Sequence, residues 1–381
     1  MTPGITQLLT LHADWLAGKR VALLGHQAAV DAQGCGTAEL LRAALGGRLV
    51  ALFGPEHGYD GCVLAGEHVA SAAHSAWGIP VHSLYGSQRA PTAEMLRGVD
   101  VLVCDLQDIG ARCYTYLATL KRALEACAEN GVEVIVCDRP TPLPCVVDGP
   151  IAPPEAEHFV SPAGFAMCTG MTPGEAARWF DAGRGIVRVA RMEGWTRDAR
   201  RTAQWPEFIA PSPSLRTWES TATYLATVFG EALPDVDIGR GTNLAFRVVA
   251  APWFDGRAMA AQLEAENLEG VRFNPFRYIA AHGAHQGKIL EGVKLTVTDP
   301  QRFRPVWTSL VMLDCLGASV WQTAGARHAW FDTLYGGPEL RLALMSGASR
   351  VALRALCHAG QEAYRAARAD VLCYADMTSA F

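Results

Sequence analysis

The feature that most constrains the fold is a series of short, mostly apolar runs in the first half of the chain. These runs occupy residues 21–25, 49–53, 80–84, 99–105 and 132–138. Stretches with helical periodicity lie between them, at 37–45 and 115–130, and a further one follows at 172–180. Apolar strands that alternate with helices are typical of a parallel sheet with helices on both faces. The sequence therefore predicts an α/β fold with a doubly wound parallel sheet, to which 186–190 and 208–210 are weaker candidate strands.

The pattern changes after Pro211-Ser212-Pro213-Ser214. Beyond this break a helix is predicted at 221–229, a loop at 239–243 and an alternating strand at 293–299. We therefore expect two domains, a catalytic domain over residues 1–218 and a smaller α/β (α+β) domain over residues 219–381 that closes a cleft. The proline-rich stretch 140–154 is predicted to be a long surface loop.

Composition narrows the classes of partner. The 381 residues are 19% charged with a formal net charge of −5, so the chain lacks the basic stripe expected of a nucleic-acid-binding protein. No apolar run approaches the roughly 18 residues of a membrane span. The first residues show neither a basic region nor a continuous apolar region, so no signal peptide is expected. The eleven cysteines contain no CxxC pair, which favours free thiols and a cytoplasmic location.

Polar side chains follow three of the predicted strands at the point where each ends. Glu56 and His57 follow the run 49–53, Gln107 and Asp108 follow 99–105, and Asp138 and Arg139 come at the end of 132–138. The carboxyl ends of parallel strands meet at one edge of a sheet, where ligands of α/β proteins bind. The sequence therefore predicts an active site at this edge.

Paired carboxylates are the minimal equipment for glycoside hydrolysis, in which one protonates the leaving oxygen and the other acts as base or nucleophile. Glu56, as general acid, with Asp105, Asp108 or Asp138 would supply such a pair. Arg112 and Arg139 are candidate clamps for a substrate carboxylate, and Tyr85 and Tyr114 are candidate platforms for a sugar ring. Structural roles compete with these: Asp105 and Asp138 as caps or ion-pair partners, Arg112 as an ion-pair partner of Asp108, and His57 as a group that only orients Glu56.

Other chemistries lack their sequence patterns. No GxGxxG follows the first strand, and neither a GxxxxGK[ST] nor a GxSxG motif occurs. The histidines are scattered without a ligand pattern, so neither a metal nor a cofactor is expected. In the second domain, Gly239-Arg240-Gly241-Thr242 is a candidate backbone nest for an anion, with Arg240 as its charged partner.

At these residues the chain resembles the NamZ-like exo-β-N-acetylmuramidases, a family formerly described only as a domain of unknown function. The resemblance covers most of the chain and is carried by blocks in the order of the family. These are Phe53-Gly54-Pro55-Glu56-His57-Gly58, Ser83-Leu84-Tyr85-Gly86, residues 105–116 (DLQDIGARCYTY), Asp138-Arg139-Pro140, Gly170-Met171-Thr172-Pro173-Gly174-Glu175, Gly194-Trp195, Pro211-Ser212-Pro213 and Gly239-Arg240-Gly241-Thr242.

The resemblance implies a Rossmann-like N-terminal domain, a smaller C-terminal domain, and removal of β-1,4-linked N-acetylmuramic acid (MurNAc) from the non-reducing end of peptidoglycan fragments. Glu56 matches the glutamate thought to be catalytic in the family, and Asp108 is our candidate for the second catalytic group. The lactyl carboxylate of the substrate would suit Arg112, Arg139 or Arg240. The expected substrate-binding residues are His57, Tyr85, Gln107, Arg112, Tyr114, Asp138, Arg139, Arg240 and Thr242.

Three blocks depart from the family pattern. Thr141 stands where the family has Asn, Ser214-Leu215-Arg216 replaces Asn-Met-Pro, and residues 231–236 (EALPDV) replace Glu-Gly-Thr-Asn-x-Ser. Because these positions would grip the sugar, two alternatives stay open. The chain is either a glycosidase that acts on another amino sugar or a sugar- or muropeptide-binding protein without catalysis.

Overall fold

The computed structural model describes residues 1–197 and 207–375. Its larger sheet has seven strands in the order β3-β4-β2-β1-β5-β6-β9. Their bounds are β1 (Val21–Gly25), β2 (Leu49–Gly54), β3 (Ala72–Ala73), β4 (Pro80–Ser83), β5 (Val101–Asp105), β6 (Glu133–Cys137) and β9 (Val187–Ala190). All neighbours are parallel except the edge pair β3–β4. Since β2 and β5 flank β1, the order reverses at β1, as in a doubly wound sheet.

The sheet separates two apolar cores. Ala22 and Leu24 of β1 belong to one buried cluster, whereas Val21 and Leu23 belong to another. Successive side chains of a strand point to opposite faces, so a strand between two helix layers must be apolar throughout. The helices around the sheet are α1 (Gly4–Thr10), α2 (Thr37–Leu45), α3 (Thr115–Glu129) and α4 (Pro173–Asp181).

The predicted strands and helices are confirmed with small changes at their ends. Helix α2 has the predicted bounds, and α4 begins with a capping box in which the Thr172 side chain and the Glu175 side chain satisfy each other's backbone N–H groups. The candidate strand 208–210 is wrong, because these residues form no strand. The surface-loop prediction for 140–154 is also wrong: residues 140–149 are buried, and the stretch includes strand β7 (Asp148–Ile151).

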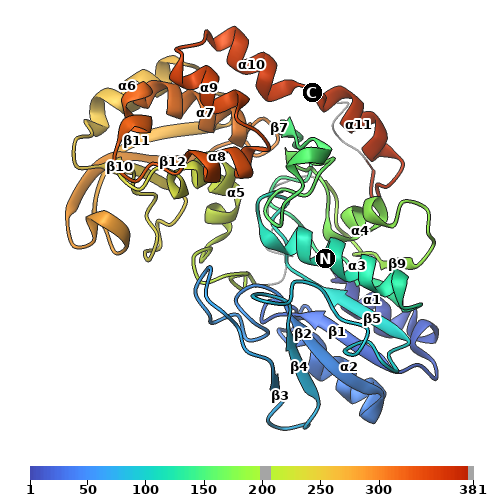
Figure 1. Cartoon of the computed structure of the whole chain (residues 1–381). Coiled ribbons are helices and arrows are strands. Elements are labelled where there is room, and N and C mark those ends of the chain that lie inside the picture. Colours follow the sequence, from blue (N-terminus) through green and yellow to red (C-terminus); the bar gives the residue numbers. More distant parts are fainter. Residues whose placement is uncertain (198–206, 376–381) are drawn as a thin grey trace.

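The second domain is built on a three-stranded antiparallel sheet. Its order is β10-β12-β11, with β10 (Val248–Ala251), β11 (Val271–Ile279) and β12 (Ile289–Val297). Its helices are α5 (Trp218–Thr227), α6 (Gly256–Ala265), α7 (Pro305–Leu316), α8 (His328–Tyr335), α9 (Glu339–Met345) and α10 (Arg350–His358). Figure 1 shows this domain in yellow to red beside the blue-to-green first domain.

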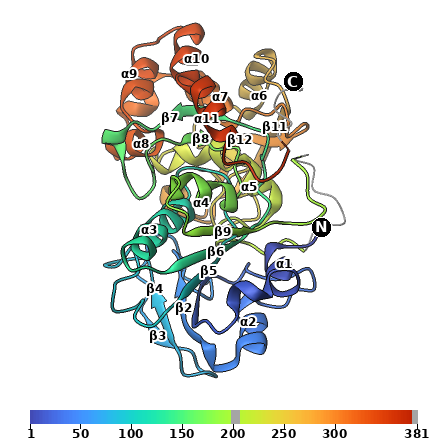
Figure 2. The same ribbon diagram turned by 90° about the vertical axis from the view of Figure 1, so that its right-hand side faces the viewer.

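Two segments tie the domains together. Strand β7, paired with β8 (Ala166–Cys168), places Asp148 so that its carboxylate accepts the backbone N–H groups of Val306 and Trp307 at the start of α7. Helix α11 (Gln361–Ala369) lies next to α4 in both Figures 1 and 2. Beside it, the Arg178 guanidinium of α4 donates to the carbonyl oxygen of Val371 at 2.8 Å. The last helix therefore packs on the first domain.

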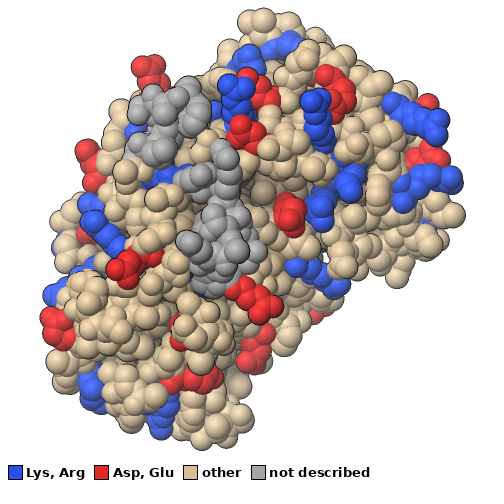
Figure 3. Space-filling model, turned by 180° about the vertical axis from the view of Figure 1, so that it is seen from behind, with Lys and Arg blue, Asp and Glu red and all other residues tan. Residues whose placement is uncertain are grey.

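The surface carries charges of both signs. On the face seen in Figure 3, blue and red side chains are interspersed over both domains. None of the helices in the described part of the chain is long and apolar enough to cross a membrane.

Candidate active site

Glu56 lies in the first turn after β2, at the carboxyl edge of the parallel sheet. Its residue is only 8% exposed, and its carboxylate accepts three hydrogen bonds. The donors are the Gly66 N–H at 3.1 Å, the Thr115 hydroxyl at 2.6 Å and the Tyr85 hydroxyl. Burial and the charge of Glu56 raise the pKa of Tyr85 to about 12, so this hydroxyl keeps its proton. Both oxygens of Glu56 are therefore held by hydrogen-bond donors.

The turn that carries Glu56 needs unusual backbone geometry. A Cβ on Gly54 would lie 2.4 Å from the Tyr59 nitrogen, so only glycine fits there. His57 adopts a left-handed φ of 73°, and its Nδ1 donates to the Val63 carbonyl oxygen at 2.8 Å. Burial lowers the pKa of His57, although the neighbouring Glu56 charge opposes this. A neutral His57 thus fastens the loop that covers Glu56.

Asp108 follows β5 and has a different environment from Glu56. Its Oδ1 accepts the Gly110 N–H at 2.6 Å, whereas its Oδ2 is buried without a hydrogen-bond partner among the described residues. Burial raises the pKa of Asp108 to about 7, against the effect of two backbone donors. This carboxyl therefore keeps its proton below neutral pH, as a proton donor must.

Two neighbouring tyrosines, whose ring planes are tilted by 55°, interact with both carboxyl groups. The rings of Tyr114 and Tyr116 are 4.7 Å apart, and the Tyr116 hydroxyl donates to the Pro211 carbonyl oxygen at 2.8 Å. Burial raises the pKa of Tyr114, and the charges of both Asp108 and Glu56 add to this effect. Glu56, Asp108 and Tyr114 thus belong to one electrostatic cluster.

The second domain contributes Arg240 and Glu231. Their side chains form an ion pair at 2.6 Å and are each about one quarter exposed (26% and 21%). The positive charge of Arg240 contributes to the lowered pKa of His57, and burial raises the pKa of Glu231, as does the charge of Glu56. The ion pair therefore lies close to Glu56 and His57, and Arg240 keeps donor groups beyond the one that Glu231 accepts.

Arg112 does not reach this site, which corrects the expectation that it clamps the substrate. Its side chain is fully buried and donates to three backbone carbonyl oxygens, of Pro150 at 2.6 Å, Phe165 at 2.9 Å and Leu334 at 3.1 Å. Nor does it pair with Asp108, the alternative that the sequence allowed. Arg112 instead joins β7, β8 and α8, and burial lowers its pKa to about 10.

Asp138 and Arg139 are likewise occupied by structural contacts. The Asp138 carboxylate accepts from the Arg139 and Gly174 N–H groups and from the hydroxyls of Thr172 and Tyr374, all between 2.8 and 3.0 Å. Arg139 pairs with Asp105 and donates to the Val30 carbonyl oxygen. The structural alternatives for Asp105 and Asp138 are the ones observed, and the predicted substrate contacts of Asp138 are corrected accordingly.

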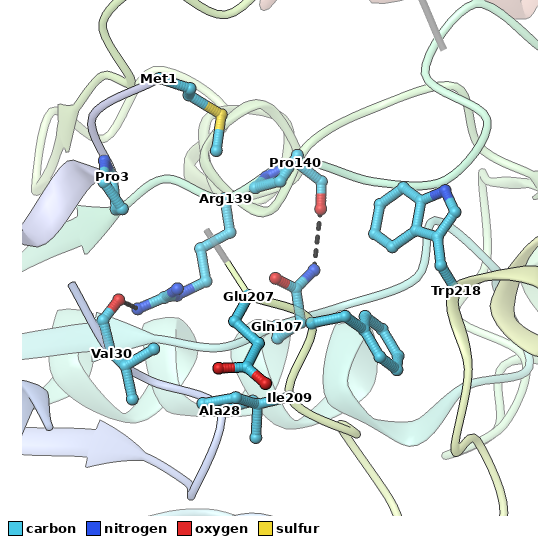
Figure 4. A pocket seen from close by; sticks show the side chains of 11 residues that line it. Met1, Pro3, Ala28, Val30, Gln107, Arg139, Pro140, Glu207, Ile209 and Trp218 are labelled. Carbon is cyan, nitrogen blue, oxygen red and sulfur yellow. Dashed lines mark hydrogen bonds between the residues drawn. The ribbon is translucent and has the colours of Figure 1, made fainter. Parts of the chain in front are cut away.

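Gln107 and Arg139 line a separate hollow of about 450 Å³ (Figure 4). The Gln107 amide donates to the carbonyl oxygens of Pro140 and Asp108, at 2.8 and 3.0 Å. Neither Glu56 nor Asp108 lines this hollow. The expected contact of Gln107 and Arg139 with a substrate at Glu56 is therefore not supported by their position.

The predicted anion nest around Arg240 is closed. The Gly239 N–H donates to the Asp237 carboxylate at 2.7 Å, and the Thr242 hydroxyl donates to the Gly239 carbonyl oxygen at 2.6 Å. Thr242 also accepts the Leu244 N–H, so it shapes the turn. Only the Arg240 side chain of this motif is directed to the cluster around Glu56.

One group of side chains has the spacing of a metal site. Ligand atoms of Asp148, Cys357 and His358 lie within 4.8 Å of one another. Asp148, however, already accepts the N–H groups of Gly149, Val306 and Trp307 as the cap of α7. Its role is explained without an ion.

The sequence analysis missed Thr115 and Glu231 as contributors to the site. Thr115 lies inside the DLQDIGARCYTY block, but nothing local marks its hydroxyl as the partner of a carboxylate 59 residues away. Glu231 lies in a block that departs from the family pattern, and only the fold brings it to Arg240.

The chain is similar to known proteins along most of its length. Residues 21–219 match the family described as "Exo-beta-N-acetylmuramidase NamZ, N-terminal", and residues 222–374 match its C-terminal counterpart. A curated relative, peptidoglycan beta-N-acetylmuramidase NamZ of Bacillus subtilis (strain 168), is 37% identical over 314 residues, which are 81% of this chain and 76% of the relative.

Two solved structures share the fold. Both are DUF1343 family proteins of Bacteroides fragilis NCTC 9343, and both are covered over 98% of this chain and 99% of their own. One has a TM-score of 0.91 at 30% identity, and the other a TM-score of 0.77 at 24% identity. The α/β architecture is thus shared along the full chain.

Proposed function

Since the chain belongs to the NamZ family and is a glycosidase of the muramidase type, we propose that it is exo-acting and releases MurNAc from the non-reducing end of peptidoglycan fragments. The fragment is a MurNAc–GlcNAc disaccharide or a muropeptide. The departures at Thr141, Ser214 and residues 231–236 replace neither Glu56 nor Asp108, and we propose that they bear on which sugar fits.

The observation that carries the mechanism is the contrast between Glu56 and Asp108. Glu56 accepts hydrogen bonds from three donors, whereas Asp108 has one oxygen without a hydrogen-bond partner among the described residues and its pKa is raised by burial to about 7. Two carboxyl groups in such different surroundings can supply the base or nucleophile and the acid of glycoside hydrolysis. These environments favour Asp108 as the acid, in place of the acid role that the sequence analysis gave to Glu56.

The proposed step is hydrolysis at C1 of the terminal sugar. The bond between C1 and the leaving oxygen breaks, Asp108 gives its proton to that oxygen, and Glu56 stabilises the positive charge that develops on the ring. Water supplies the hydroxyl of the product, and its proton returns to Asp108. Tyr85, Tyr114 and His57 surround Glu56 and are the proposed sugar contacts, with Arg240 at the side of the second domain.

We also propose a cytoplasmic location and a role on peptidoglycan fragments that have entered the cell. The eleven cysteines support this, because none of them forms a disulfide and most are buried. Cysteines without disulfides in such number are typical of a reducing compartment.

The first test is release of para-nitrophenol from the β-glycosides of MurNAc and N-acetylglucosamine. Release from the muramide that is lost in Glu56→Gln but kept in Glu125→Gln, a change on the exposed side of α3, supports the proposal. Release from the glucosaminide alone would favour another amino sugar. Binding of MurNAc–GlcNAc by calorimetry without release of sugar would favour a binding protein, and near-normal turnover in Glu56→Gln would exclude the assignment of Glu56.

A further inference from the structure

Strand β4 brings a second loop to the edge that carries Glu56. It is parallel to β2, and the Leu84 N–H after it donates to the Gly54 carbonyl oxygen at 2.9 Å. The loop that begins there carries Tyr85, whose hydroxyl donates to Glu56, and Arg89, which is exposed. The positive charge of Arg89 acts on the Tyr85 hydroxyl and lowers its pKa, against the dominant effect of burial. Arg89 therefore lies beside the proposed catalytic carboxylate.

Helix α3 brings a second arginine to the same place. Arg122 lies seven residues after Thr115, the residue that donates to Glu56. Positions seven apart lie on one face of a helix, about 10 Å apart along its axis. Arg122 is thus on the face of α3 that faces Glu56, two turns further along.

Both arginines surround one buried aromatic ring. Phe159, from the segment between β7 and β8, is 3% exposed. The guanidinium carbon of Arg89 lies 4.9 Å from the centre of its ring, and that of Arg122 lies 5.2 Å away. The Tyr85 ring is 6.1 Å from the same ring. Phe159 thus fixes two cations next to a tyrosine that contacts Glu56.

The charges at this platform are not balanced. Lys121 pairs with Glu157 at 2.7 Å, and the other oxygen of Glu157 accepts the Ala163 N–H. Neither Arg89 nor Arg122 has a carboxylate partner within the described ranges 1–197 and 207–375. The nearby His158 has a pKa lowered by burial and by both arginines, so it adds no charge near neutral pH. Arg122 also helps to lower the pKa of Glu157, but this carboxylate is already paired with Lys121, so the two arginines leave a net positive charge that suits an anion.

We propose that Arg89 and Arg122, arranged around Phe159, bind the carboxylate of the 3-O-lactyl group of the sugar and so select a muramic acid over a glucosamine. The proposal rests on the proposed function for the placement of the sugar at Glu56. Arg89 and Arg122 take the role that the sequence suggested for Arg112 and Arg139, whose side chains are occupied by contacts inside the protein. Arg240 has no part in this selection because Glu231 balances its charge. Guanidinium groups suit a carboxylate because they donate two parallel hydrogen bonds to it.

The test measures binding directly, so it does not depend on turnover. Calorimetry with MurNAc and with N-acetylglucosamine is performed on the wild type, on Arg89→Gln/Arg122→Gln, on Arg240→Gln and on Arg302→Gln, a surface control whose side chain is 57% exposed. We expect the double variant to lose about 10- to 100-fold in affinity for MurNAc, the loss typical of a charge-assisted hydrogen bond, with unchanged affinity for N-acetylglucosamine. Arg302→Gln should keep both affinities, and Arg240→Gln, which alters a proposed sugar contact, should keep the ratio between them even where it weakens both.

Two outcomes would overturn the assignment: a wild type without preference for MurNAc, or a double variant that keeps it. Two further ligands, the lactyl amide of MurNAc and a muramoyl dipeptide, show which carboxylate of the ligand the arginines bind. The neutral amide should bind to the wild type as weakly as MurNAc binds to the double variant. A dipeptide bound more tightly than MurNAc through the same arginines would mean that the site reads a peptide carboxylate, and the lactyl assignment would be wrong. Preference for MurNAc without any hydrolysis would instead leave this site intact and exclude the proposed hydrolase.

Discussion

Replacing Asp108 by Asn should stabilise the protein at alkaline pH while it removes activity. The reason is the cost of ionising a buried carboxyl. Its pKa rises from 3.8 in the unfolded chain to about 7 in the folded protein, and one pKa unit corresponds to about 1.4 kcal/mol. The ionised form of Asp108 is therefore disfavoured in the fold by about 4 kcal/mol.

The sign follows from proton binding. Between these two pKa values the folded protein keeps the proton that the unfolded chain has lost, so the free energy of unfolding falls as the pH rises. About 2–3 kcal/mol of that loss develops between pH 5 and pH 8. Asn does not titrate, so the variant escapes the loss, although its new amide donor costs about 1–3 kcal/mol if it stays unbonded. Burial also raises the pKa of Asp138 to about 7. Because Asp138 is present in both proteins, its contribution cancels in the difference between their free energies of unfolding.

The assay is urea denaturation of both proteins at pH 5 and pH 8, together with kcat/KM on the muramide. We expect the difference in unfolding free energy, variant minus wild type, to increase by about 2–3 kcal/mol from pH 5 to pH 8. We expect kcat/KM to fall by about 10²- to 10⁴-fold, the usual contribution of a general acid. A difference in unfolding free energy that is the same at pH 5 and pH 8 would refute the raised pKa of Asp108. A variant that stays active would refute the role of Asp108 as the acid.

Three further predictions follow from single contacts. In the wild type, kcat/KM should fall as the pH rises through about 7, because Asp108 loses its proton there; a flat profile to pH 9 would contradict this. Thr115→Val removes the 2.6 Å hydrogen bond to Glu56 and should lower kcat/KM by about tenfold with little change in melting temperature. Tyr374→Phe removes the hydroxyl that donates to Asp138 and accepts the Met192 N–H, and should lower the free energy of unfolding by about 1–3 kcal/mol at unchanged kcat. A loss of kcat with unchanged stability would place Tyr374 in the site instead.

Local sequence patterns were sufficient to predict most strands of the larger sheet and the fold class of the molecule. Apolar runs such as that of β1 are buried on both faces, so their period and composition identify them without knowledge of their neighbours. The glycines and proline around Glu56 likewise marked a turn, and parallel strands bring all such turns to one edge. The placement of Glu56 after β2 and of Asp108 after β5, at one edge of the sheet, could therefore be expected from the sequence, as could the family.

The role of each charged side chain was decided only by the tertiary structure. Arg112 is satisfied by a carbonyl oxygen 222 residues away, and Asp138 by a hydroxyl 236 residues away. The platform of Arg89, Arg122 and Phe159 is assembled from three separate segments. Whether a charge is free for a substrate depends on which distant groups desolvate and neutralise it, and this is a property of the packed fold that no local pattern contains.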